Sequence, residues 1–448
     1  MKLMSDYLDI AASLNSKSLT LFVGTGFSKY LTNDKAPNWL ELLVEATKVI
    51  DNRSHDLRNQ LFQIDDSENV KSCVFELTIC AQILDEEFKH KRKDLKEEIA
   101  RIVKERINDK TIDKTKLKQL QDFFSTHSNI NIVTTNYDTL FSDFIVPFNS
   151  RIFIEGSTIP RINTGHNIYH VHGCITKPSS ILLTLNDYYN FQNQNNYFSR
   201  KFYTLLQEST FAILGYSLAD FNLNTILSEV KNTKKGSLRK SEIYYVTRND
   251  ISELVSKFYH TSYGIKVIKH TTVENFFYNI QEEYNTAKNL IESVSILQEV
   301  IDGLSLYSDS FLKLRTALSQ IMIQASSIGL DSTNEPFLKT LIKILKTKKE
   351  FTTEYNAWDQ YYHFADWLIE IASTIIIKGT IIEQDFCDLA EYSLKKSSRE
   401  NWTGYSWQSW REWHFRWREM KIENQKMLQE LVEEKMWSTH NDIENIFT

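Results

Sequence analysis

Six short runs of β-branched, aromatic and aliphatic residues, separated by helical stretches, constrain the fold of this chain most strongly. The runs cover residues 19–23, 130–134, 168–171, 211–214, 243–247 and 265–269. Several are continuously apolar, as central strands of a parallel sheet are when helices cover both of its faces. The pattern predicts an α/β domain with a doubly wound parallel sheet over residues 1–275. A long helical insert is expected between the first two runs, at about residues 40–125.

The pattern changes to helical periodicity after about residue 280, and Pro336 is the only proline in this half. Only 12 glycines and 5 prolines occur among the 448 residues, so few positions interrupt a helix. We therefore predict an all-α C-terminal domain over residues 280–448. Four of its eight tryptophans, at 407, 410, 413 and 417, recur three or four apart and form one helical stripe. The stripe either packs into a helical core or forms a surface that binds a partner.

The net charge and the short length of the apolar runs exclude several classes of protein. The net charge of −6 argues against direct nucleic-acid binding by this chain alone. No apolar run reaches the length of a membrane span, and the N-terminal residues lack the apolar core of a signal peptide. We therefore expect a cytoplasmic protein with no membrane partner. The four cysteines are scattered without a C-x-x-C pair, so we predict no metal site.

The first run leads directly into Gly24-Thr25-Gly26-Phe27-Ser28. A strand followed by G-x-G at the start of a helix suits the phosphates of a dinucleotide, because glycines allow close backbone approach. The third glycine of the dehydrogenase fingerprint is missing. A tight structural turn therefore explains this motif equally well.

Polar residues also follow three later strands, at the edge of the sheet where ligands of doubly wound folds bind. Asn136 and Asp138 follow the second run, although either could instead cap a helix. His172 precedes a glycine after the third run and is placed for acid–base chemistry or ribose contact. Strand alternation predicts that His170 lies on the same side as His172, and a buried structural histidine is the alternative. The fourth run ends in the turn of Gly215 and Ser217, which could bond a ribose or a phosphate.

Taken together, GTGFS, TTNYD, VHG and GYSLAD, in this order, resemble the sirtuin superfamily, and more narrowly its bacterial defence branch, which cleaves NAD. The resemblance covers roughly residues 15–270 and includes the LLTLNDY stretch at 182–188. It implies a Rossmann-like, sirtuin-type domain that takes NAD as its substrate. The implied cofactor-binding residues are Gly24, Thr25, Gly26, Ser28, Thr135, Gly215 and Ser217. The implied catalytic residues are Asn136, His172 and Asp138.

Departures from the deacylase branch of that family favour hydrolysis. The four-cysteine zinc module of the deacylases is absent, because only Cys174 occurs between Gly173 and Leu214. Thr135 replaces the family's glutamine, and the sequence at 37–40 lacks the arginine of the family's cofactor loop. We expect Asn136 to position the ribose and the attacking water. We expect His172 to accept a proton and Asp138 to orient the nicotinamide amide.

The leading hypothesis is an NAD glycohydrolase of antiphage defence by abortive infection, held inactive until assembly or a trigger activates it. The alternatives are a zinc-free NAD-dependent deacylase and a non-catalytic scaffold that binds NAD or ADP-ribose. The helical half is the expected place for assembly. The resemblance implies either a homo-oligomer or a complex with a HerA-type hexameric ATPase.

Overall fold

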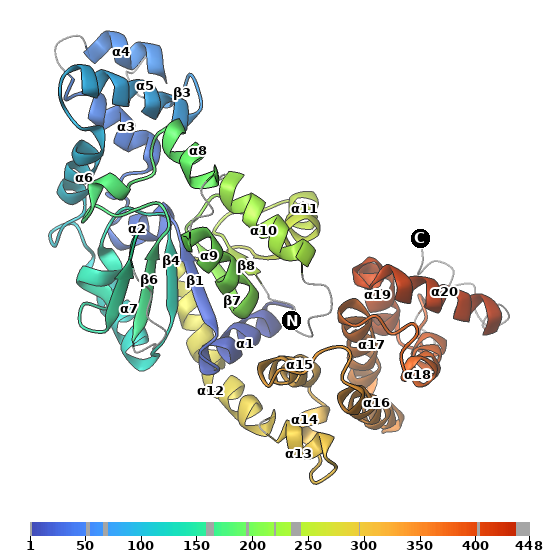
Figure 1. Cartoon of the computed structure of the whole chain (residues 1–448). Coiled ribbons are helices and arrows are strands. Elements are labelled where there is room, and N and C mark those ends of the chain that lie inside the picture. The colour runs from blue at the N-terminus through green and yellow to red at the C-terminus, as the bar shows by residue number, and fades with distance from the viewer. Residues whose placement is uncertain are drawn as a thin grey trace. The chain divides into compact units, whose positions relative to one another are not determined.

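The computed structural model describes residues 2–50, 54–65, 70–157, 165–193, 197–218, 221–233, 243–294, 296–400 and 404–435. Contacts divide the chain into two compact units, residues 1–233 with 241–284, and residues 234–240 with 285–448. The long helix α12 (Val273–Val294) begins in the first unit and continues into the second (Figure 1). Among the helices in the described ranges, none has both the length and the apolarity to cross a membrane.

A seven-stranded parallel sheet in the order β5-β6-β4-β1-β7-β8-β9 forms the centre of the first unit. The strands are β1 (Leu19–Val23), β4 (Asn131–Thr134), β5 (Ser150–Phe153), β6 (His166–His170), β7 (Thr210–Leu214), β8 (Ile243–Val246) and β9 (Ile265–Ile268). In the central strand β1, all five residues are buried. The predicted doubly wound sheet is confirmed.

Helices cover both faces of the sheet. On one face, α1 (Lys2–Asn15), α7 (Lys114–Thr126) and α12 meet through aromatic contacts, with ring centroids 6.2 Å apart for Tyr7–Phe276 and 4.7 Å for Phe123–Phe277. On the other face, strand residues such as Phe22 and Phe211 share a core with Phe202 of α9 (Tyr197–Glu208). The helices α10 (Phe221–Thr233) and α11 (Glu253–Tyr263) continue this layer. Because successive side chains of a strand point to opposite faces, each strand packs against both helical layers, and the sheet lies between them.

The insert between β1 and β4 has its own core and lies beyond the carboxyl ends of the strands (Figure 1). Its helices are α3 (Trp39–Thr47), α4 (Ser54–Leu61), α5 (Leu77–His90) and α6 (Leu95–Arg106). It also contains an antiparallel hairpin of β2 (Phe62–Ile64) and β3 (Val70–Cys73), which the sequence did not predict. The insert core includes Tyr137, Cys174 and Leu183 from the loops after β4 and β6. The insert is therefore packed directly against the loops that follow the strands.

All helices and strands assigned in the described residues of the second unit are helices, as predicted. Its helices are α13 (Leu297–Ile301), α14 (Asp309–Leu312), α15 (Ala317–Ser327), α16 (Glu335–Glu350), α17 (Trp358–Thr374), α18 (Glu383–Lys395), α19 (Trp407–Arg416) and α20 (Ile422–Lys435). Trp410, Trp413 and Trp417 are buried, and the Trp413 indole donates a 3.0 Å hydrogen bond to Ser393 Oγ. Trp407 is 42% exposed. Three of the four tryptophans in the stripe therefore belong to the helical core.

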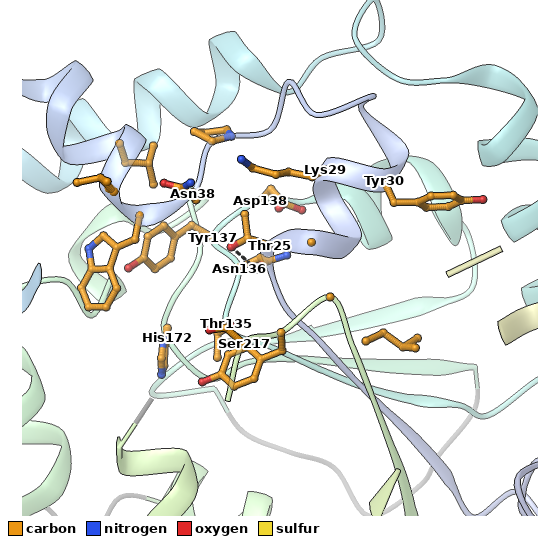
Figure 2. Close-up of a pocket in the computed structure, with 18 of the residues that line it drawn as sticks. Thr25, Lys29, Tyr30, Asn38, Thr135, Asn136, Tyr137, Asp138, His172 and Ser217 are labelled. Atoms are coloured by element: carbon orange, nitrogen blue, oxygen red, sulfur yellow. Dashed lines mark hydrogen bonds between the residues drawn. The ribbon is translucent and has the colours of Figure 1, made fainter. Parts of the chain in front are cut away.

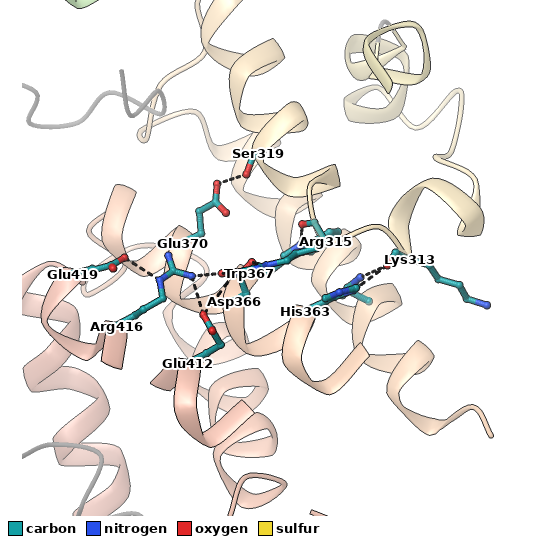
Figure 3. A network of polar contacts seen from close by, with 11 residues as sticks. Lys313, Arg315, Ser319, His363, Asp366, Trp367, Glu370, Glu412, Arg416 and Glu419 are labelled. Carbon is teal, nitrogen blue, oxygen red and sulfur yellow. Dashed lines mark hydrogen bonds and ion pairs between the residues drawn. The ribbon is translucent and has the colours of Figure 1, made fainter. Parts of the chain in front are cut away.

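A buried carboxylate, Asp366 on α17, organises a charged network in this unit (Figure 3). Arg315 donates to it from Nε at 2.7 Å and from a terminal nitrogen at 3.1 Å, and Arg416 on α19 pairs with it from the other side. Burial raises the pKa of Asp366, but Arg416 and Arg315 together hold that pKa below its ordinary value. Because an unpaired buried charge is costly, the two arginines fix α17 against α19 and the loop before α15.

Candidate functional site

The site lies where the order of the strands reverses. From β1 the chain proceeds to β4 on one side and later returns to β7 on the other side of β1. Ligands of doubly wound folds bind outside the carboxyl ends of the strands at such a point. A cavity of about 1400 Å³ occupies this edge. Its size exceeds the 300–1000 Å³ that is typical of pockets for small ligands, so an extended ligand such as a dinucleotide fits within it.

Three glycines bring the loops after β1 and β7 into direct backbone contact. Gly26 N donates a 2.7 Å hydrogen bond to Gly215 O, and Gly24 N donates a 3.0 Å bond to Leu214 O. A methyl group on Gly26 would lie 2.7 Å from Gly215 Cα. Gly215 itself has a φ of +62°, which favours glycine. The predicted glycine turn is thus a backbone-to-backbone junction, and Gly26 and Gly215 line the cavity whereas Gly24 lies behind it.

A chain of hydrogen bonds fixes the amide of Asn136. Asn136 Nδ2 donates to Ser28 Oγ at 2.8 Å, and Ser28 Oγ donates to Asp138 Oδ2 at 2.7 Å. Thr25 Oγ1 lies 3.4 Å from Asn136 Oδ1, the bond drawn in Figure 2. Ser28 is 2% exposed and does not line the cavity. The structure places the Ser28 hydroxyl between Asn136 and Asp138, and cofactor binding by Ser28 stays a prediction.

The backbone before and after Asn136 is also fixed. Asn136 N donates to Thr134 Oγ1 at 3.0 Å, and that hydroxyl donates to Val23 O in β1 at 3.0 Å. After the motif the chain forms a π-helical turn, Leu140–Ile145, and Leu140 N donates to Asp138 Oδ1 at 3.1 Å. Such turns are frequent at functional sites. Both carboxylate oxygens of Asp138 are thus used to hold the protein together.

Asp138 is buried although it borders the cavity. Burial raises the pKa of Asp138, while the hydrogen bonds from Ser28 and Leu140 favour the ionised form. A carboxylate that is already bonded to the protein at both oxygens is best suited to position its neighbours. In the structure Asp138 supports Ser28 and, through it, Asn136, while its predicted catalytic role stays a prediction.

The two histidines after the third predicted run occupy different environments. The strand β6 ends at His170, so the alternation expected for His170 and His172 does not continue to His172. His170 is 3% exposed and its Nδ1 lies 3.1 Å from Asn136 O, and burial lowers its pKa. His172 lines the cavity (Figure 2). At Gly173, φ is +85° and a methyl group would lie 2.2 Å from Ser180 O, so glycine is required for the turn that exposes His172.

The structure brings most of the predicted site residues to one cavity. The predicted residues that line it are Thr25, Gly26, Thr135, Asn136, Asp138, His172, Gly215 and Ser217. Gly24 and Ser28 are the two predicted residues behind its wall. Ala219 and Asp220, the last two residues of the GYSLAD motif, lie outside the described residues. The roles of the residues at the wall remain predictions.

Sequence reasoning missed two parts of the cavity wall. One part comes from the insert and α8 (Leu185–Asn193) and includes Trp39 and Tyr188, whose rings stack with centroids 5.8 Å apart. The other part follows β8 and β9 and includes residues 247–249 and 271–274. The rule that polar residues follow parallel strands could have found the second part. Trp39 and Tyr188 lie in the stretches 37–40 and 182–188 that carry the resemblance, but the contact between their rings depends on the packing of the insert.

No group of three or more histidine, cysteine, aspartate or glutamate side chains in the described residues is placed to hold a metal ion. Cys174 is buried in the insert core. The predicted site residues bring to the cavity an amide, a carboxylate, hydroxyls, an imidazole and backbone at glycine. Such groups can bind sugar hydroxyls and phosphates and can move a proton.

Comparison with known proteins identifies a domain in this part of the chain. Residues 130–268 match the family model of the SIR2-like domain, and this segment runs from β4 to β9. The chain is also similar to defense-associated sirtuin 2 from Bacillus subtilis, with 22% identity over 193 residues. That alignment covers 38% of this chain and 19% of the relative. The segment 130–268 that matches the family model contains Asn136, His172 and Gly215, whereas the first glycine turn precedes it.

Proposed function

Because this chain carries a SIR2-like domain, we propose that it is an NAD glycohydrolase, which cleaves NAD to nicotinamide and ADP-ribose. The observation that carries the proposal is the meeting of Asn136 and His172 in the wall of one cavity, beside the junction of Gly26 and Gly215. A domain that only bound the dinucleotide would not need an oriented amide and an imidazole in the same cavity wall. The resemblance to sirtuins supplies NAD as the substrate.

The reaction needs little from a general acid. The nicotinamide nitrogen of NAD carries a positive charge, so it takes the electron pair of the breaking bond to C1′ of the ribose and leaves as a neutral molecule. A water oxygen then bonds to C1′ and loses a proton. In our proposal His172 accepts that proton and the Asn136 amide positions the water and the ribose. The developing positive charge on the ribose needs polar groups that are already oriented, which the bonds to Ser28 provide.

The similarity to a protein named as defence-associated supports a biological role. We propose that the chain acts in antiphage defence by abortive infection, in which loss of NAD stops the infected cell. An unregulated NAD glycohydrolase would deplete its own cell, so the activity must depend on a trigger or on assembly. We further propose that the chain assembles either with copies of itself or with a HerA-type hexameric ATPase.

Chromatography of nicotinamide and ADP-ribose after incubation with NAD tests the proposed reaction. The full-length chain is compared with Asn136→Ala and His172→Ala, with and without the product of the neighbouring gene. The exposed residues Asn59 and His90 provide the matched controls Asn59→Ala and His90→Ala. We expect both products from the wild type and both controls, and a loss of about 100-fold or more in each site variant.

Other outcomes identify the alternatives. If NAD binds but no condition yields nicotinamide, the chain is a binding scaffold. If nicotinamide appears only with an acylated peptide, the chain is a deacylase. Cyclic ADP-ribose in place of the linear product would show that a ribose hydroxyl or the adenine, and not water, attacks C1′.

A further inference from the structure

We propose that Tyr188 is a positioning residue for His172, and that the ion pair between Lys96 and Asp187 holds Tyr188 in place. The proposal rests on the proposed function, because it explains how the imidazole is oriented for NAD cleavage. It assigns a role to the insert, which supplies Lys96 and Trp39.

Three aromatic rings lie in sequence along the cavity wall. Tyr188 meets His172 edge to face, with ring centroids 5.7 Å apart and an interplanar angle of 72°. Tyr188 also stacks with Trp39, with ring centroids 5.8 Å apart and an interplanar angle of 16°. All three residues line the cavity. Aromatic pairs favour these two geometries, so the position of Tyr188 restricts the rotation of the His172 ring.

The end of α8 that carries Tyr188 is fixed by a capping arrangement. Asp187 Oδ2 accepts hydrogen bonds from Leu183 N at 3.0 Å and from Thr184 N at 2.9 Å, and Asp187 N donates to Thr184 Oγ1 at 3.2 Å. These reciprocal bonds define where the helix begins and at what angle the chain enters it. Tyr188 is the next residue along the chain, so its backbone is set by this cap.

The other oxygen of Asp187 is bound by the insert. Lys96 Nζ on α6 lies 2.7 Å from Asp187 Oδ1, and the two side chains are 20% and 18% exposed. Burial raises the pKa of Asp187, but Lys96 and the backbone N–H groups hold that pKa below its ordinary value. A partly buried ion pair whose carboxylate also caps a helix restricts the position of that helix more than an exposed surface pair would.

Trp39 is fixed in the same manner at the start of α3. Asn38 Oδ1 accepts from Glu41 N at 2.8 Å, and Glu41 Oε2 accepts from Asn38 N at 2.7 Å. Glu41 also pairs with Lys29 on α2 (Thr25–Leu31) at 3.0 Å. Tyr188 is thus held between an indole fixed by one cap and an imidazole that it orients itself. Movement of the insert would therefore change the orientation of His172.

The test compares three variants with a matched control. Lys96→Met removes the charge and keeps the length of the side chain, Lys96→Arg restores the charge, and Tyr188→Leu removes the ring. The control is Lys118→Met, which breaks the exposed pair of Lys118 with Asp122 on α7. In each variant of the full-length chain, the NAD dissociation constant and the kcat of nicotinamide release are measured.

We expect Lys96→Met and Tyr188→Leu to lower kcat at least about tenfold while the NAD dissociation constant changes much less. Lys96→Arg should regain most of that loss. Wild-type kcat in Lys96→Met or in Tyr188→Leu would overturn the proposal. Equal losses of binding and kcat that arginine does not restore would also overturn it, since they indicate a general structural defect.

A second measurement does not depend on NAD cleavage. The imidazole resonance of His172 is observed in histidine-labelled protein and identified by its loss in His172→Gln. Lys96→Met and Tyr188→Leu should shift that resonance and its titration, whereas Tyr188→Phe and Lys118→Met should preserve it. If the resonance is unchanged in Tyr188→Leu, the positioning role is wrong. If it shifts but the wild type never releases nicotinamide, the proposed function fails while the positioning role stands.

Discussion

Gly215 occupies one of the most crowded backbone positions at the site. A methyl group there would lie 2.2 Å from Phe27 N and 2.6 Å from Gly26 C, and φ is +62°. Gly303 also has a positive φ, +74°, but nothing lies within 4 Å of a methyl group at that position. Alanine at Gly303 therefore tests the cost of the backbone conformation alone, whereas alanine at Gly215 adds the cost of steric crowding.

We predict that Gly215→Ala weakens NAD binding at least about tenfold and forces the two glycine loops apart, because the methyl group cannot be accommodated. Gly303→Ala should cost only the conformational penalty, about 1–2 kcal/mol of stability, and leave NAD binding unchanged. Calorimetric titration of NAD and thermal unfolding measure both effects. Wild-type NAD affinity in Gly215→Ala would show that the glycine junction is not needed for the ligand.

Residue types and their order were enough to predict which residues gather at the cavity, because parallel strands place their carboxyl ends at one edge. They were not enough to separate ligand contacts from supporting contacts. Ser28 and Asp138 are both predicted site residues and bond to each other at 2.7 Å, but Ser28 holds Asn136 from behind the wall whereas Asp138 borders the cavity. That distinction depends on the exact depth of each side chain, which only the packed structure defines.

At the scale of the elements, burial separates the members of the tryptophan stripe on α19. Trp413 is fully buried and bonded to Ser393, whereas Trp407 is 42% exposed and lies under the Arg411 guanidinium, which is 4.8 Å from its ring. We predict that Trp413→Ala destabilises the helical unit by about 3–5 kcal/mol through the cavity that it leaves. Trp407→Ala should cost under about 1 kcal/mol. Equal melting temperatures for the two variants would contradict this assignment.

The contact between α17 and the loop after α14 makes the stability of the protein depend on pH. His363 Nδ1 lies 3.2 Å from Lys313 O, and burial, with a contribution from the nearby Lys348 charge, lowers the pKa of His363 to about 4. The ordinary value is 6.5, so between pH 6.5 and 4 the unfolded chain binds more protons than the folded chain. Stability is therefore lost as the pH falls through that window.

We predict that, through this histidine, the free energy of unfolding of the full-length chain falls by on the order of 2 kcal/mol between pH 6.5 and 4. His363→Gln should remove that part of the pH dependence, whereas His90→Gln, at an exposed position, should leave it unchanged. The measurement is the melting temperature as a function of pH for the three proteins. Identical pH profiles for His363→Gln and the wild type would refute the assignment.

The sequence pattern predicted the apolar strands of the sheet and missed the more exposed β5 and the hairpin β2–β3. β1 and β7 are buried along their whole length, and their continuous apolar runs reveal them. β5 at the edge of the sheet has only one buried residue of four, and its SRIF sequence carries an arginine. The hairpin β2–β3 is equally short and partly exposed. Their formation depends on pairing with neighbours, which periodicity alone does not reveal.

At the scale of the whole molecule, the chain combines a sheet unit, part of which matches the family model of the SIR2-like domain, with a helical unit. The cavity and every predicted site residue belong to the first unit. The second unit contains a buried charge network and a tryptophan-rich core. We propose that the first unit performs the chemistry and the second serves assembly or triggering.

The stoichiometry of NAD cleavage tests the central claim most directly. Purified full-length chain is incubated with NAD and no acylated peptide, under the triggering conditions that give the highest activity. Our account predicts that nicotinamide and ADP-ribose appear in equal amounts and match the NAD consumed, and that Asn136→Ala abolishes both while still binding NAD. Unchanged NAD in every condition, or cleavage that survives Asn136→Ala at the wild-type rate, would contradict the account.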